Sequence, residues 1–229
     1  MTRALPAGCT VLPELFGEPG RELMGCFHPA RGASLGRVAI LASPPGHEHG
    51  RCHRSFWRLA DQLARRGLAV LRFDCLGMGD SALESDAVVL EDWVGSIESA
   101  AQRARELSGA GSVDFVGLRL GATLGVLAAS AKRVGFERVV LWQPVVDGGA
   151  MVDELIEAHR IFAESLGHTV VESADGRTEV MGYRYSSDMI NELRRLRIDG
   201  SARVGARQVT VLDNSAEREL EGLASKLDA

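Results

Sequence analysis

The chain has 229 residues, of which 45% are hydrophobic and 25% charged, a composition typical of one soluble globular domain with a sizeable core. Its net charge of -5 argues against a nucleic-acid-binding protein, because neutralising phosphates requires a basic face. No apolar run approaches the length that spans a membrane, and no signal peptide is recognisable. The four cysteines are widely spaced, with no C-x-x-C pair, so we expect reduced thiols and a cytoplasmic location.

The N-terminal part of the chain predicts a hairpin followed by a buried strand. Residues 10–16 and 22–28 have strand-like composition and flank the turn cluster Gly17-Glu-Pro-Gly20, which favours an antiparallel hairpin. Residues 37–43 are continuously apolar and end at Pro44-Pro45-Gly46. This pattern is typical of a buried strand that opens into a loop at the carboxyl edge of a sheet.

Helices and strands then alternate. An amphipathic helix is predicted over residues 53–66 and ends at Gly67. The apolar strand 68–74 leads into a glycine-rich loop, and a second amphipathic helix spans residues 90–107.

The stretch from Val113 to Leu127 passes from an apolar strand directly into a helix through Gly117-x-x-x-Gly121, and this helix is expected to end near Gly135. The glycine spacing is that of the G-x-S-x-G nucleophile elbow, a strained turn that lifts one side chain clear of the sheet edge. The lifted residue here is Arg119, and a guanidinium cannot be deprotonated to attack a carbonyl. The same glycines also fit a plain strand-to-helix turn in a parallel sheet.

The alternation is interrupted once before the C-terminus. Residues 138–146 predict a buried strand that ends at Asp147-Gly148-Gly149. Residues 150–200 then contain two helix-like runs, 151–166 and 187–196, around a polar stretch at 172–178, and we interpret this part as a lid-like insertion. A final strand over 207–213 and a final helix over 216–227 complete one domain that covers residues 1–229.

A hairpin that feeds a series of strand-helix units predicts an α/β fold with an open, mostly parallel sheet flanked by helices. In such sheets, ligand sites gather outside the carboxyl ends of the strands. Polar and glycine-rich segments follow the predicted strands at residues 44–53, 74–81, 118–121, 147–149 and 213–215. Their coincidence at one edge predicts a ligand pocket there.

The chain resembles the α/β-hydrolase superfamily through the Pro-Gly loop, the segment Asp74-x-x-Gly77-x-Gly79-x-Ser81 and the elbow spacing. More closely, Gly117-Leu-Arg-Leu-Gly-Ala122 and Leu141-Trp-x-Pro-Val-Val-Asp-Gly148 look like a bacterial branch related to serine aminopeptidases and exosortase-associated hydrolases. In that branch, too, arginine is found at the elbow. The resemblance covers roughly residues 10 to 227.

The resemblance places candidate triad acids at Asp147 and Asp213, which follow the last two sheet strands. Asp213 also fits a helix N-cap or Asx turn. A triad histidine is expected after a further strand, but the last histidine is His168, inside the predicted insertion. Relative to the superfamily pattern, the C-terminus is therefore expected to be short, and the usual proton transfer has neither nucleophile nor base.

The sequence offers residues for two replacement chemistries. Cys75, on a loop at the same edge, is an atypical nucleophile candidate if a neighbour lowers its thiol pKa, although a buried inert cysteine is the commoner situation. His47, His49, Cys52 and His53 offer metal ligands, but their spacing matches no standard zinc pattern, so we predict no metal and no cofactor. We attribute these histidines to loop shaping and to the start of a helix at His53.

Three interpretations of Arg119 remain open: an ion pair with Asp74, Asp147 or Asp213, the binding of a ligand carboxylate or phosphate, and contact with a partner protein. A desolvated arginine requires an anion in each case. The predicted ligand-binding residues are Gly46, His47, Asp74, Leu118, Arg119, Leu120, Asp147 and Asp213.

The functional hypothesis is therefore a degenerate member of the fold that binds a small acyl or anionic compound without hydrolysing it. The alternatives are an active esterase, thioesterase or acyltransferase with an atypical nucleophile, and a scaffold that binds a protein partner or a second copy of itself.

Overall fold

The computed structural model describes residues 11–168, 176–198, 202–214, 220 and 222–227. They contain a seven-stranded sheet in the order β1-β2-β4-β3-β5-β6-β9. The first two strands pair antiparallel, β2 is antiparallel to β4, and all later neighbours are parallel, which confirms the predicted hairpin and the single, mainly parallel sheet. The strands are β1 Leu12–Phe16, β2 Leu23–His28, β3 Arg37–Ala42, β4 Ala69–Phe73, β5 Ser112–Leu118, β6 Arg138–Trp142 and β9 Gln208–Leu212.

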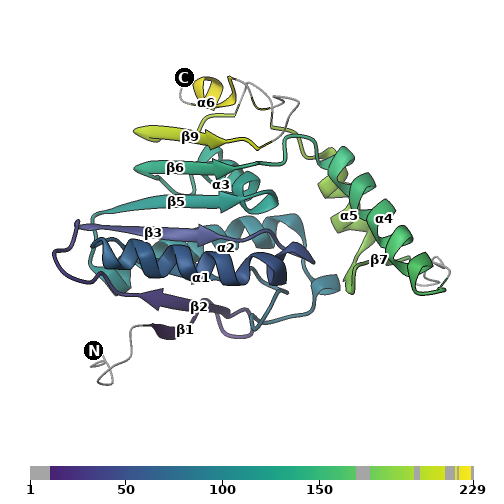
Figure 1. The fold of residues 1–229 in the computed structure, drawn as a ribbon, viewed down its shortest axis with the longest axis horizontal. Coiled ribbons are helices and arrows are strands. Elements are labelled where there is room, and N and C mark those ends of the chain that lie inside the picture. The colour runs from purple at the N-terminus through teal and green to yellow at the C-terminus, as the bar shows by residue number, and fades with distance from the viewer. Residues whose placement is uncertain (1–10, 169–175, 199–201, 215–219, 221, 228–229) are drawn as a thin grey trace.

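Helices cover both faces of this sheet (Figure 1). Because side chains alternate along a strand, Ala39 and Leu41 of β3 pack against α1, while Val38 and Ile40 belong to the core on the opposite face, which includes α2 and α3. The helices are α1 Glu48–Arg65, α2 Leu90–Ser108, α3 Leu120–Ser130, α4 Gly148–Ser165, α5 Ser187–Arg195 and α6 Leu223–Leu227, with a 3₁₀ turn η1 at Ser85–Ala87. No helix in the described part of the chain is both long and apolar enough to cross a membrane.

Residues 148–168 and 176–195, which we call the α4–α5 segment, lie beyond the ends of β3, β5, β6 and β9 toward which the strand arrows point (Figure 1). The segment contains α4, a two-stranded hairpin of β7 Thr178–Val180 and β8 Tyr183–Tyr185, and α5. The two helices were predicted and the hairpin was not, because its strands have three residues each. Part of the predicted polar stretch, residues 172–175, lies outside the described residues.

Three predicted boundaries were wrong. The first helix begins at Glu48 and not at His53. Its first turn buries no apolar side chain, so the amphipathic pattern that predicted the helix appears only further along the chain. Strand β6 ends at Trp142, four residues early, where Gln143 has a positive φ of 44° and Pro144 lacks an N–H to donate. Helix α3 ends at Ser130, short of Gly135, because Lys132 has a φ of 57°.

The C-terminal prediction is only partly covered by the structure. Residues 215–219 and 221 lie outside the described part, and within it the predicted final helix over 216–227 corresponds to α6. Residue Ser215 of the last predicted loop and Cys9 also lie outside it. The other three cysteines are free thiols, as predicted.

Candidate functional site

The turn between β5 and α3 holds Arg119 in a strained conformation. Its φ of 51° and ψ of -125° lie in a region that non-glycine residues rarely adopt. The neighbouring strand β6 holds the turn in place, because the Arg119 amide donates a hydrogen bond of 2.9 Å to the carbonyl of Trp142, the last residue of β6. Two glycines permit it: a Cβ at Gly117 would collide with Ala122, and one at Gly121 would lie 2.5 Å from the Ala42 carbonyl oxygen. These contacts explain the glycine spacing by steric exclusion.

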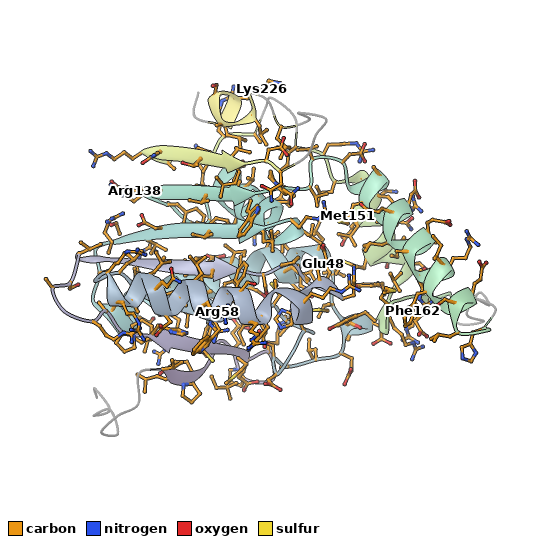
Figure 2. The ribbon with its side chains drawn as sticks, in the orientation of Figure 1. Glu48, Arg58, Arg138, Met151, Phe162 and Lys226 are labelled. Atoms are coloured by element: carbon orange, nitrogen blue, oxygen red, sulfur yellow. The ribbon has the colours of Figure 1, made fainter. Side chains whose placement is uncertain are left out.

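The Arg119 guanidinium contacts two glutamates of other elements. Its Nε lies 3.4 Å from Oε1 of Glu48 at the start of α1, and its Nη2 lies 3.5 Å from Oε2 of Glu154 on α4. Figure 2 shows Glu48 at the end of α1 that faces the α4–α5 segment. Within the described residues, these are the carboxylates that pair with Arg119. Of the three interpretations of Arg119, the structure shows an ion pair, but its partners are these glutamates and not Asp74, Asp147 or Asp213.

Asp147 and Asp74 have other partners. Asp147 accepts a hydrogen bond from the Ala150 amide as N-cap of α4 and pairs with Arg197 at 3.1 Å. Asp74 Oδ1 lies 3.3 Å from Nε2 of His49. Asp213 is exposed directly after β9, at the predicted edge, and has interactions of its own. The role of Asp213 as a triad acid thus stays a prediction.

A small apolar cavity of about 20 Å³ lies next to this site, between the sheet edge and the α4–α5 segment. Two aromatic rings line it, Trp93 and Tyr185, which meet edge to face with their centres 6.4 Å apart. Burial raises the pKa of Tyr185 and lowers that of His47, which also lines the cavity. The complete lining is Pro45, His47, Glu48, Trp93, Leu120, Met151, Val152, Leu155, Val180, Tyr185, Ile190 and Leu193.

The structure brings some predicted ligand residues to this cavity and leaves others at its edge. His47 and Leu120 line it. Gly46 lies against Tyr185, because a Cβ at Gly46 would collide with the Tyr185 hydroxyl. Leu118 is half-buried at the end of β5, against the α1 side of the core. Sequence reasoning missed Glu48, Glu154 and Tyr185, whose only signal was their place on segments that meet at this edge.

Cys75 is not a usable nucleophile. The residue is 4% exposed and belongs to the main hydrophobic core. Burial strongly raises the pKa of its thiol, which suppresses the reactive thiolate. The sequence placed it on a loop correctly but could not show that the loop folds inward.

Most of the histidine- and cysteine-containing segment after Gly46 is part of a helix. His49, Cys52 and His53 lie in the first turns of α1, and His47 is its N-cap residue. Within the described ranges, no group of three histidine, cysteine, aspartate or glutamate side chains could hold a metal ion.

Comparisons with known proteins concern the fold. No protein-family profile and no curated protein sequence matches the chain. Among solved structures, Est1E from Butyrivibrio proteoclasticus with bound ferulic acid is similar at a TM-score of 0.68 and 17% identity, over 94% of this chain and 85% of that one. XC6422 from Xanthomonas campestris, described as an α/β serine hydrolase without a lid, has a TM-score of 0.52 and 20% identity over 63% and 65%. The predicted fold is thereby confirmed.

Proposed function

We propose that this protein of the α/β-hydrolase fold binds a small acyl or anionic compound at Arg119 and does not hydrolyse it there. The β5–α3 turn has the glycine spacing and positive φ of a nucleophile elbow, so we assign it that role in the fold. Its central side chain is a permanent cation and offers no lone pair for attack on a carbonyl. A cation at this position favours a bound anion.

The observation that carries the proposal is the weak pairing of Arg119. Its side chain is 30% exposed, and the side chain of Glu154 is 70% exposed. Exposed ion pairs at such distances stabilise by only about 0 to 1 kcal/mol. A ligand carboxylate can form two parallel hydrogen bonds with the guanidinium and therefore compete with Glu154.

The neighbouring cavity suits the apolar part of an acyl compound. Its walls are mainly aliphatic and aromatic, and it begins at Leu120, the residue after Arg119. A volume of about 20 Å³ holds one or two waters, so a longer chain requires the α4–α5 segment to shift outward. We propose that this segment acts as a lid. The neighbour Est1E holds ferulic acid, a carboxylic acid, which supports this ligand class.

Calorimetric titration with linear carboxylates of four to ten carbons, and with alcohols of matched length, tests the proposal. Affinity should rise with chain length and should be weaker for the alcohols. Arg119→Ala should remove the preference for the carboxylate, whereas Arg58→Ala on the exposed side of α1 should leave it unchanged. Equal affinity of carboxylate and alcohol, or absence of binding by either series, would reject the proposal.

A scaffold role is the second candidate, and one surface favours it. Ile161 and Phe162 of α4 and its C-cap residue Leu166 are 55%, 49% and 58% exposed, and Figure 2 shows Phe162 at the end of α4 far from the sheet. Exposed apolar side chains of this kind are common at contact surfaces. Light scattering after size-exclusion chromatography should detect self-association that Phe162→Arg abolishes and Leu15→Arg, on β1, does not. A monomer at all concentrations would exclude the homo-oligomeric form of this role.

A further inference from the structure

Ser43, His49 and Asp74 lie together at a cavity separate from the one beside Arg119. Oγ of Ser43 is 2.9 Å from Nδ1 of His49, and Nε2 of the same ring is 3.3 Å from Oδ1 of Asp74. With the ring proton on Nε2, facing the carboxylate, the lone pair of Nδ1 faces the serine hydroxyl. The three side chains are thus in the order nucleophile, base and acid.

Each of the three is held by a different element. Ser43 directly follows β3, His49 is the second residue of α1, and Asp74 directly follows β4. The Asp74 carboxylate is also fixed from behind, because its Oδ2 accepts a hydrogen bond of 3.2 Å from the Asp80 amide. A Cβ at Gly79 would collide with the same carboxylate, so this loop closes around it only with glycine there.

The group opens into a cavity of about 80 Å³ beneath α1, which is also lined by Cys26, Arg72, His53 and Asp80. Arg72 is 8% exposed, and its Nε donates to Nε2 of His28 at 3.2 Å. Among the described residues, no carboxylate lies within ion-pair distance of its guanidinium. A buried cation without a contacting anion is costly, and it favours negative charge that develops in this cavity.

We propose that Ser43 is a nucleophile for short, uncharged acyl esters, with His49 as general base and Asp74 as the group that orients and stabilises the imidazolium. Ser43 Oγ forms a bond to the carbonyl carbon while its proton moves to His49 Nδ1. The carbonyl electron pair moves to oxygen, where Arg72 offsets the charge. Collapse expels the alcohol, which takes the proton from His49, and a water then hydrolyses the acyl-serine by the same steps.

The cavity defines the substrate class. About 80 Å³ accommodates an acyl group of a few heavy atoms, whereas a long chain does not fit. Asp74 and Asp80 disfavour an anionic substrate at the same wall. The two cavities share no lining residue, so hydrolysis at Ser43 and ligand binding at Arg119 can be tested separately.

Hydrolysis of p-nitrophenyl acetate by the full chain tests the inference, together with peptide mass mapping of an acid-quenched reaction. Ser43→Ala should reduce turnover to background, and His49→Gln should reduce it by about 10²-fold or more. Ser96→Ala is the matched control, because Ser96 is also buried and hydrogen-bonded but lies on α2, outside this cavity. Acetate should be preferred to the hexanoate ester.

Mass mapping of the folded wild-type chain needs no variant and guards against a Ser43→Ala protein that fails to fold. An acetyl group on Ser43 supports the inference. Absence of turnover and of acetylation at Ser43, acetylation at another residue only, or full turnover by a folded Ser43→Ala variant would each overturn it. Loss of carboxylate binding at Arg119 affects none of these readouts.

Discussion

Replacing Arg119 by alanine and by glycine separates the two energetic consequences of its position. Its ion pairs with Glu48 and Glu154 are long, at 3.4 and 3.5 Å, and only partly buried, so their loss should cost less than about 1 kcal/mol. Had the guanidinium been buried against one aspartate, truncation would cost about 3 to 5 kcal/mol. The structure therefore predicts that Arg119→Ala unfolds at nearly the wild-type denaturant concentration.

Glycine at the same position should be more stable than alanine. A positive φ of 51° costs a residue with a Cβ about 1 to 3 kcal/mol, and glycine adopts it without this penalty. Glycine loses about 0.4 to 1 kcal/mol through the greater freedom of the unfolded chain. The difference between these two terms predicts that the free energy of unfolding of Arg119→Gly is about 1 kcal/mol higher than that of Arg119→Ala. For a chain of this size, this corresponds to roughly 2 to 4 °C in Tm.

Urea unfolding followed by circular dichroism measures both comparisons. An alanine variant destabilised by 3 kcal/mol or more would show that the guanidinium has a buried partner. A glycine variant no more stable than alanine would show that the turn is not strained as described.

Three further predictions concern neighbouring groups. Glu154→Gln should tighten carboxylate binding by up to about fivefold, because the variant removes a carboxylate whose ion pair with Arg119 is worth up to about 1 kcal/mol. Asp153→Asn is the control, since Asp153 is equally exposed but pairs with Arg194, and it should leave the affinity unchanged. Equal affinities of the two variants in calorimetry would contradict competition between Glu154 and the ligand. Gly46→Ala should destabilise the fold by more than about 1 kcal/mol, because the φ of Gly46 is 86° and the added Cβ would collide with Tyr185. An unchanged unfolding midpoint would show that the β7–β8 hairpin, which carries Tyr185, is free to move away. Burial lowers the pKa of His28 from 6.5 to about 4, so between these pH values the unfolded chain binds a proton at His28 and the folded chain does not. Roughly 2 to 3 kcal/mol of stability should therefore be lost as the pH falls from 6.5 to 4. A His28→Gln variant whose stability falls with pH in the same way would refute this.

The central strands of the sheet were predictable from sequence because they are largely apolar runs followed by loop-forming residues. Residues 37–43, which end at Pro44-Pro45-Gly46, are the clearest example, since burial on both faces leaves no polar alternation to blur the pattern. The start of α1 was not predictable in this way, because its first residues bury only Cys52 and look like a polar loop.

The candidate site was predictable only to the level of the sheet edge. The spacing around Gly117 and Gly121 indicated that Arg119 would occupy the turn between β5 and α3, and the structure shows the backbone strain there. Its partners could not be predicted, because Glu48 and Glu154 lie far away in the sequence and either could have faced solvent. Contacts between distant elements depend on packing that local pattern does not encode.

The most direct measurement is a crystal structure of the protein with a bound medium-chain carboxylate such as octanoate. We predict that the carboxylate lies within hydrogen-bond distance of the Arg119 guanidinium, that Glu154 no longer contacts it, and that the chain extends past Leu120 into a widened cavity beside Trp93. An octanoate bound elsewhere, with Arg119 still paired to both glutamates and the cavity still closed, would contradict the proposed function.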